Sequence, residues 1–268
     1  MSADERGPVQ QFRAQPNEAA EPGASAATAG GFAARLEQIL PGLAVDPVLL
    51  ELALTHRSWA YENGGTAHNE RLEFLGDSVL ALAVTARLFR EQPDASEGEL
   101  ARRRSALVSA TALAEVARRI GLGEHIRLGR GEELTGGRQK QSILADTVEA
   151  VIGAVFEDQG PAVAERFVLA LVGPLFDEVE RFGAAMDPKT ALQELAAARG
   201  LPAPRYEVEG SGPDHNRVFA AVVRLGEVEG RGAGASKKAA EAAAAMAAWT
   251  LAQPAKPAEG RPGEAQAV

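Results

Sequence analysis

The sequence contains no cysteine, few aromatic residues and no long apolar run. The absence of cysteine among its 268 residues excludes disulfides, thiolate zinc sites and cysteine nucleophiles. Its four histidines are scattered through the chain and lack metal-ligand spacing: His56, His68, His125 and His215. No stretch of 18 apolar residues predicts a membrane span, and the N-terminus carries Asp4 and Glu5 but no apolar segment of a secretory signal. We therefore expect a cytoplasmic protein that makes no membrane contact.

Positive charge is also scarce. The chain has 28 Lys and Arg against 37 Asp and Glu, which gives a formal net charge of −9. Phosphate backbones are bound mainly by cationic surface, so this balance argues mildly against a nucleic-acid partner. A hydrophobic content of 46% supports a packed core, and the length fits one or two domains.

Residues 68–80 gather acidic side chains on one face of a predicted helix. At about 100° per residue, Glu70, Glu73 and Asp77 fall within an arc of roughly 60°. The apolar side chains are expected on the opposite, buried face: Leu72, Leu75, Val79 and Leu82. Carboxylates at these spacings repel one another. Either water and salt screen them on a solvated face, or a divalent cation binds there.

A second segment, residues 142–156, is apolar nearly all round and carries only two charged side chains. Asp146 and Glu149 lie three residues apart and therefore share one helix face. Such a helix is normally buried, and buried carboxylates must be paired or must coordinate a metal. No Lys or Arg lies within one turn of either acid inside the segment. The two acid pairs can therefore meet around hard cations, which prefer oxygen ligands.

These two segments together resemble the ribonuclease III family. Residues 68–80, HNERLEFLGDSVL, resemble the family signature, and residues 53–58, ALTHRS, resemble the segment that precedes it. Residues 142–151 resemble the family's second acidic helix, with Asp and Glu at the same spacing. The match is specific, because thirteen consecutive residues and a distant acid pair agree.

The resemblance implies an endoribonuclease that cuts both strands of double-stranded RNA, leaving 5′-phosphate and 3′-hydroxyl ends with short 3′ overhangs. It implies two Mg²⁺ ions, with Mn²⁺ able to substitute, and no small-molecule cofactor. By residue-wise carry-over the metal ligands are Glu73, Asp77, Asp146 and Glu149. Asp77 and Glu149 are expected to be catalytic and the least tolerant of substitution. Glu70 and Glu97 match further acids near the same valley, although a screened surface acid and an ordinary helix N1 acid explain them equally well.

The resemblance also implies a homodimer, in which two acid clusters line one valley, and roles in processing ribosomal RNA precursors and structured messenger RNA. Phe74 lies at the edge of the acidic face, away from Leu72 and Leu75. A large apolar residue in that place is expected to pack on another subunit.

Composition divides the chain into a helical part and a mixed part. Residues 1–31 and 253–268 are of low complexity, and we predict two disordered tails. Residues 32–182 are predicted to form an all-helical catalytic domain, which includes a helix capped by Asp46, a capping box at Ser96 and a helix capped by Thr111. A last helix is expected to end near Phe182, and the Gly-rich residues 129–137 are expected to be a flexible loop. Residues 183–186 are the predicted linker.

Residues 187–252 predict an α-β-β-β-α unit, so the whole chain is expected to be mainly α with a small α+β domain. Strand-like runs cover residues 205–209, 217–225 and 227–232, between a helix opened by Asp187 and one capped by Ser236. This order resembles the double-stranded RNA-binding domain. The expected RNA contacts are Gln193, Glu194, His215, Ser236, Lys237 and Lys238. Lys237 and Lys238 suit phosphate, since a helix N-terminus adds free N–H groups and dipole to their charge.

The charge of this domain limits its expected affinity for RNA. Residues 187–252 hold eight acids and eight bases, and Glu241 takes a place where many such domains carry a lysine. We expect weak, salt-sensitive binding that two domains in a dimer strengthen by avidity. The rival interpretation is a non-catalytic double-stranded RNA-binding protein, against which the presence of all four carboxylates argues. An enzyme without its own RNA-binding domain is excluded by residues 187–252.

Overall fold

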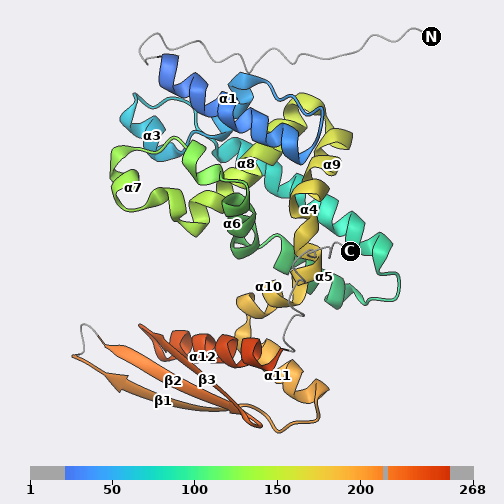
Figure 1. Cartoon of the computed structure of the whole chain (residues 1–268), viewed down its shortest axis with the longest axis vertical. Coiled ribbons are helices and arrows are strands. Elements are labelled where there is room, and N and C mark those ends of the chain that lie inside the picture. The colour runs from blue at the N-terminus through green and yellow to red at the C-terminus, as the bar shows by residue number, and fades with distance from the viewer. Residues whose placement is uncertain (1–21, 214–216, 254–268) are drawn as a thin grey trace, which may run out of the picture. The chain divides into compact units, whose positions relative to one another are not determined.

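The computed structural model describes residues 22–213 and 217–253 of the chain (Figure 1). The chain divides into two compact units, Met1–Val179 and Glu180–Val268. The disorder predicted for residues 1–21 and 254–268, and the RNA contact predicted for His215, lie outside the described residues. None of the described helices is long and apolar enough to cross a membrane.

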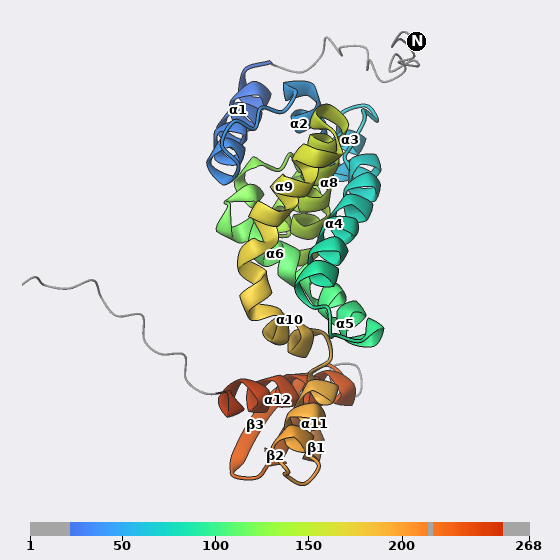
Figure 2. The same ribbon diagram turned by 90° about the vertical axis from the view of Figure 1, so that its right-hand side faces the viewer.

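The described part of the first unit is built from helices packed around one central helix, α8. Its α-helices are α1 (Pro22–Ile39), α2 (Pro47–Ala53), α3 (Arg57–Glu62), α4 (Glu70–Glu91), α5 (Glu97–Leu107), α6 (Ala110–Arg119), α7 (Arg130–Leu134), α8 (Gln141–Gln159) and α9 (Pro161–Val172). Three 3₁₀ segments connect them: η1 (Leu122–His125), η2 (Gly137–Gln139) and η3 (Gly173–Glu178). Helices α2, α4, α6 and α9 all contact α8, as Figures 1 and 2 show. Helix α8 is therefore buried on most of its surface, as its apolar sequence predicts.

Side-chain caps fix where several helices begin. The Asp46 carboxylate accepts the Val48 N–H at 2.7 Å, and Ser96 forms the predicted capping box with Glu99. The prediction that Thr111 caps the next helix is wrong. Ser109 caps it, because its hydroxyl accepts the Ala112 N–H at 3.2 Å and α6 therefore starts at Ala110.

Three further expectations need correction. Helix α1 starts at Pro22, so residues 22–31 of the predicted tail are helical; their alanines favour helix strongly. Residues 129–137 are not an unstructured loop, because they contain α7 and the start of η2. The last helix predicted to reach Phe182 is interrupted: α9 ends at Val172 and η3 follows, since Pro174 lacks the N–H that an α-helix needs.

Residues 188–252 of the second unit have the predicted α-β-β-β-α order, but residues 183–186, the predicted linker, belong to a further helix that precedes them. Helix α10 (Val179–Met186) begins at the unit boundary, and α11 (Pro188–Ala198) follows with Asp187 as its N-cap. The strands are β1 (Arg205–Ser211), β2 (Val218–Leu225) and β3 (Val228–Gly234), and the last helix is α12 (Lys237–Ala252). They form one antiparallel sheet in the order β1-β2-β3, and α12 lies along one face of it (Figure 1). The mainly helical fold with a small α+β unit is thus confirmed.

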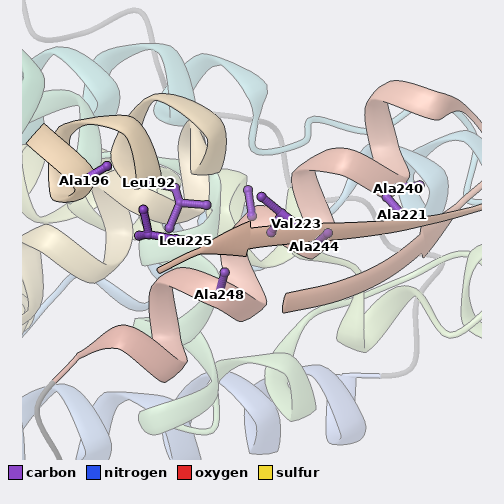
Figure 3. Packing of buried hydrophobic residues seen from close by; sticks show 9 residues of the cluster. Leu192, Ala196, Ala221, Val223, Leu225, Ala240, Ala244 and Ala248 are labelled. Atoms are coloured by element: carbon purple, nitrogen blue, oxygen red, sulfur yellow. The ribbon is translucent and has the colours of Figure 1, made fainter. Parts of the chain in front are cut away.

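Small residues let α12 pack very close to β3. A Cβ added at Gly234 would lie 2.7 Å from the Ala239 Cβ, and one added at Gly230 would lie 2.5 Å from the Ala248 backbone nitrogen. Figure 3 shows the core between the helices and the sheet, in which leucine and valine side chains meet the alanines of α12. Its fully buried members include Leu192, Val223 and Leu225.

Candidate metal centre and RNA-binding surface

The packing of α4 against α8 brings the predicted acid pairs together. Glu73 on α4 and Asp146 and Glu149 on α8 each offer a carboxylate oxygen, and these oxygens all lie within 4.8 Å of one another. All three residues are partly buried. Three carboxylates at this separation form an oxygen donor set that suits a hard divalent cation.

The raised pKa values of these carboxylates show that their ionised forms are destabilised when no cation is present. Burial, together with the charges of Asp77, Asp146 and Glu73, raises the pKa of Glu149 to about 8. Burial is also the main cause that raises the pKa of Glu73 and of Asp146. A divalent cation would offset both effects, because it replaces lost hydration and neutralises the mutual repulsion.

Asp77 has a different environment from the other three acids. It is exposed and lies one helical turn beyond Glu73 on α4. It is not part of the group within 4.8 Å, although its charge acts on Glu149. The structure therefore brings three of the four predicted metal ligands together and leaves Asp77 beside them.

A cavity of about 480 Å³ opens next to the cluster. Its lining residues are His56, Arg57, Asn69, Glu70, Glu73, Glu132, Lys140, Ser142, Ile143 and Asp146. Glu70 therefore lies at the predicted site, where it accepts a hydrogen bond of 3.4 Å from Arg57. Glu97 is the exposed first residue of α5 and is not among the residues that line this cavity.

The sequence analysis missed a further acid and a base at the same cavity. Glu132 and Lys140 form an ion pair, and the hydrogen bond from Lys140 lowers the pKa of Glu132. Glu132 belongs to residues 129–137, which were expected to be a flexible loop, and Lys140 follows three residues after that segment. Glu62 accepts the Arg130 N–H at 2.8 Å, and the Ser58 hydroxyl accepts the Gly129 N–H at 2.9 Å. No short-range spacing pattern links Glu132 to the other acids, so sequence alone held no signal for it.

The segment before the signature contributes two residues to the cavity, His56 and Arg57. The His56 ring caps α3 by accepting the Ser58 N–H at 3.2 Å, and burial lowers its pKa. His56 is therefore biased toward the neutral form and acts here as a structural cap. Arg57 is exposed and places a positive charge on the rim of an otherwise acidic cavity.

Helix α4 also exposes large apolar side chains. Phe74 is 78% exposed, Leu82 71% and Phe89 72%. The expectation that Leu82 faces the core is wrong, because Leu80, Ala83 and neighbouring buried residues supply that face instead. The three exposed side chains fall within an arc of roughly 80° on α4, so they lie on one side of the helix, and we call them the apolar stripe.

In the second unit, the described residues predicted to bind RNA are all exposed. Gln193 and Glu194 lie on α11, and Lys237 and Lys238 begin α12. The Ser236 hydroxyl caps α12 by accepting the Ala239 N–H at 3.1 Å. Cationic side chains thus stand at a helix N-terminus, where the remaining free N–H groups favour an anion.

Glu241 is engaged elsewhere in this unit. Its carboxylate forms an ion pair of 2.6 Å with Lys189 of α11. The same lysine lies 4.8 Å from the centre of the Tyr206 ring. Glu241 therefore joins the two helices of the unit as well as lowering its positive charge.

Comparison with known proteins agrees with this geometry. Residues 46–175 match the family model described as Ribonuclease-III-like, and residues 188–251 match the double-stranded RNA binding motif. Ribonuclease 3 of Leifsonia xyli is 63% identical over 78% of this chain and 89% of its own length, and that of Thermobifida fusca is 57% identical over 78% and 87%.

A solved structure of the nuclease domain of ribonuclease III from Campylobacter jejuni is also similar. It aligns with a TM-score of 0.50 and 40% identity over 53% of this chain and 97% of its own, and its description concerns a region involved in dimer formation. The two family models thus match residues in both units of the chain. The chain therefore belongs to the ribonuclease III family and is an endoribonuclease that acts on double-stranded RNA.

Proposed function

We propose that the enzyme cleaves double-stranded RNA with two Mg²⁺ ions held by Glu73, Asp77, Asp146 and Glu149. The observation that carries this proposal is the group of three partly buried carboxylates within 4.8 Å, with Asp77 close enough to raise the pKa of Glu149. Two metal ions activate a water molecule and stabilise the leaving alkoxide of a phosphodiester. The products are 5′-phosphate and 3′-hydroxyl ends with short 3′ overhangs, and Mn²⁺ can replace Mg²⁺.

The residues have separate tasks in this proposal. Glu73, Asp146 and Glu149 would hold the cations, and the exposed Asp77 would supply a further oxygen ligand. Arg57 and Lys140 place positive charge on the rim, where it offsets the repulsion between the acid cluster and an incoming phosphate. Lys237 and Lys238 contact phosphates of the duplex, while Gln193 and Glu194 reach a minor groove.

We also propose that the active form is a homodimer that uses the apolar stripe of α4, made by Phe74, Leu82 and Phe89. An exposed apolar patch of this kind marks an interaction surface. The description of the Campylobacter relative refers to dimer formation by that protein's nuclease domain. Phe74→Ala should raise the dimer dissociation constant at least tenfold, since the residue counts twice in a twofold interface. Sedimentation velocity between nanomolar and micromolar concentrations measures this, and an unchanged constant would argue against the stripe.

The biological substrates that we propose are ribosomal RNA precursors and structured messenger RNA, processed in the cytoplasm. Both contain long paired stems, which a shape-reading domain can bind without a sequence code.

The deciding experiment compares the wild type with Glu149→Gln on a long, end-labelled RNA duplex in Mg²⁺. The wild type should cut the duplex to short fragments, while the variant should bind it but leave it intact. Glu157→Gln, an exposed acid on the same helix, is the matched control and should cut normally. Binding without cutting by the wild type would refute the catalytic proposal. Equal cutting by both Glu149→Gln and the wild type would show that the wrong carboxylate has been assigned.

A further inference from the structure

We infer that Gly76 and Gly153 are positioning residues of the metal centre: they set the distance between α4 and α8 that lets the two acid pairs share cations. The inference rests on the proposed metal role of the carboxylates. It adds that the geometry of the site is fixed by backbone contact between the two helices, at positions where no side chain fits.

The contact between the helices is reciprocal. A Cβ placed on Gly76 would overlap the carbonyl oxygen of Glu149 and lie 2.9 Å from the backbone nitrogen of Gly153. A Cβ placed on Gly153 would overlap the carbonyl oxygen of Leu72 and lie 2.9 Å from its carbonyl carbon. Each glycine therefore faces the backbone of the other helix, which cannot rotate away as a flexible side chain can.

The register of these contacts ties them to the acids. Gly76 lies between Glu73 and Asp77 on α4, and it touches the backbone of Glu149 itself. Gly153 lies one turn after Glu149 and touches Leu72, the residue before Glu73. The two helices thus approach each other closely at residues adjacent in sequence to the acids, so a change in the spacing of the helices moves one acid pair relative to the other.

A methyl group at this crossing forces the helices apart. Carbon atoms in relaxed contact lie about 3.5–4.0 Å apart, so an alanine at either position requires a shift on the order of 1 Å. Mg²⁺ requires near-ideal octahedral geometry with ligands at about 2.0–2.1 Å, which is a narrow tolerance beside that shift. A substitution at the crossing should therefore weaken Mg²⁺ binding even though it removes no ligand and contacts no carboxylate.

If the two glycines served only to pack the helices, their substitution would lower stability without changing the Mg²⁺ requirement. Two control variants distinguish this packing role from the positioning role. Ile152→Ala removes a fully buried side chain from α8 without inserting a wedge, so it lowers stability alone. Gly30→Ala lies in α1 with no atom within 4 Å of the added Cβ. It should leave the Mg²⁺ requirement unchanged, while alanine in place of glycine stabilises the helix by about 0.5–1 kcal/mol.

The experiment measures, for the full chain, the melting temperature, duplex binding without divalent ions, and the Mg²⁺ concentration for half-maximal cleavage. We expect Gly153→Ala to melt earlier, to bind the duplex within twofold of the wild type, and to need at least tenfold more Mg²⁺. Mn²⁺, which is bound more tightly by the same ligands, should recover part of the loss. Ile152→Ala should melt earlier with an unchanged Mg²⁺ requirement.

A Gly153→Ala enzyme that melts earlier but keeps the wild-type Mg²⁺ requirement would overturn the inference. Gly76→Ala is the independent second variant, and both are assayed with trimethylamine oxide if they unfold, because this osmolyte favours the folded state. A wild-type enzyme whose cleavage does not depend on Mg²⁺ would instead refute the proposed function. The failure of the inference and the failure of the proposed function are therefore distinguishable.

Discussion

Metal binding at this site should release protons, because Glu149 is largely protonated near neutral pH. Its pKa is raised to about 8 by burial and by the neighbouring charges of Asp77, Asp146 and Glu73. A carboxylic acid with that pKa is about nine-tenths protonated at pH 7, and a bound cation requires the carboxylate. Binding of Mg²⁺ at pH 7 should therefore release about 0.9 proton from this group alone.

The same pKa sets the size of the pH effect on metal affinity. The ionised fraction of Glu149 is about one-hundredth at pH 6 and one-half at pH 8. Apparent Mg²⁺ affinity should therefore rise about 50-fold over that interval, or about 2.3 kcal/mol.

Isothermal titration calorimetry with Mg²⁺ tests this directly, without RNA. Runs in two buffers of different ionisation enthalpy count the released protons at each pH. The Glu149→Gln variant is the control, because it should bind Mg²⁺ more weakly and lose most of the proton release. Affinity that does not change between pH 6 and pH 8, with no proton released, would refute the reasoning.

The metal-free protein should show the opposite trend in stability. Between the unfolded value of 4.5 and the folded value of about 8, the folded chain holds a proton on Glu149 that the unfolded chain has lost. This contribution to stability therefore falls as pH rises through that window. The melting temperature in a chelator should decrease from pH 6 to pH 9, and Glu149→Gln should flatten the decrease.

Three further predictions concern other parts of the chain. Gly232→Ala should lower the free energy of unfolding of the second unit by about 1–3 kcal/mol in urea denaturation, because the added Cβ would strike the α12 backbone. Replacing both Lys237 and Lys238 by alanine should weaken duplex binding and reduce the slope of log K against log salt by about 2, as filter binding at several salt concentrations would show. Ser96→Ala should cost about 1 kcal/mol of stability in thermal unfolding, because it breaks a complete capping box; an unchanged value in any of these assays would contradict the corresponding contact.

Local signals in the sequence were sufficient for most helices and strands. Asp46 and Ser96 begin helices by contacts with residues two or three positions away, so short spacing predicts them. The same is true of the two acid pairs, whose members lie within one turn of each other. Their meeting across α4 and α8 did not follow from spacing alone; it came from the burial of an apolar helix and from family resemblance.

Two of the failures share a physical cause, which is dependence on distant residues. Residues 129–137 look flexible by composition, yet α7 is held by Glu62 and Ser58, which lie about 70 positions earlier in the chain. Periodicity placed Leu82 on the buried face, but the faces of α4 are decided by α8 and α9, which cover other residues. Neither the glycine contact of Gly153 nor the position of Glu132 can be seen before the helices are packed.

The ion pair between Glu241 and Lys189 changes how the neutral charge of the second unit is understood. A lysine at position 241 would face Lys189, so a substitution there would trade an attractive pair of 2.6 Å for a repulsive one. Glu241 therefore balances a charge inside the unit, and its cost to RNA affinity is not simply one lost lysine. Because Lys189 is occupied in this way, the phosphate contacts that we propose for α12 depend on Lys237 and Lys238, which are both exposed. A domain with so few cationic contacts gains most in RNA affinity from being present twice in one assembly. The neutral charge of the second unit is therefore a reason to expect the dimer that we propose forms through the apolar stripe of α4.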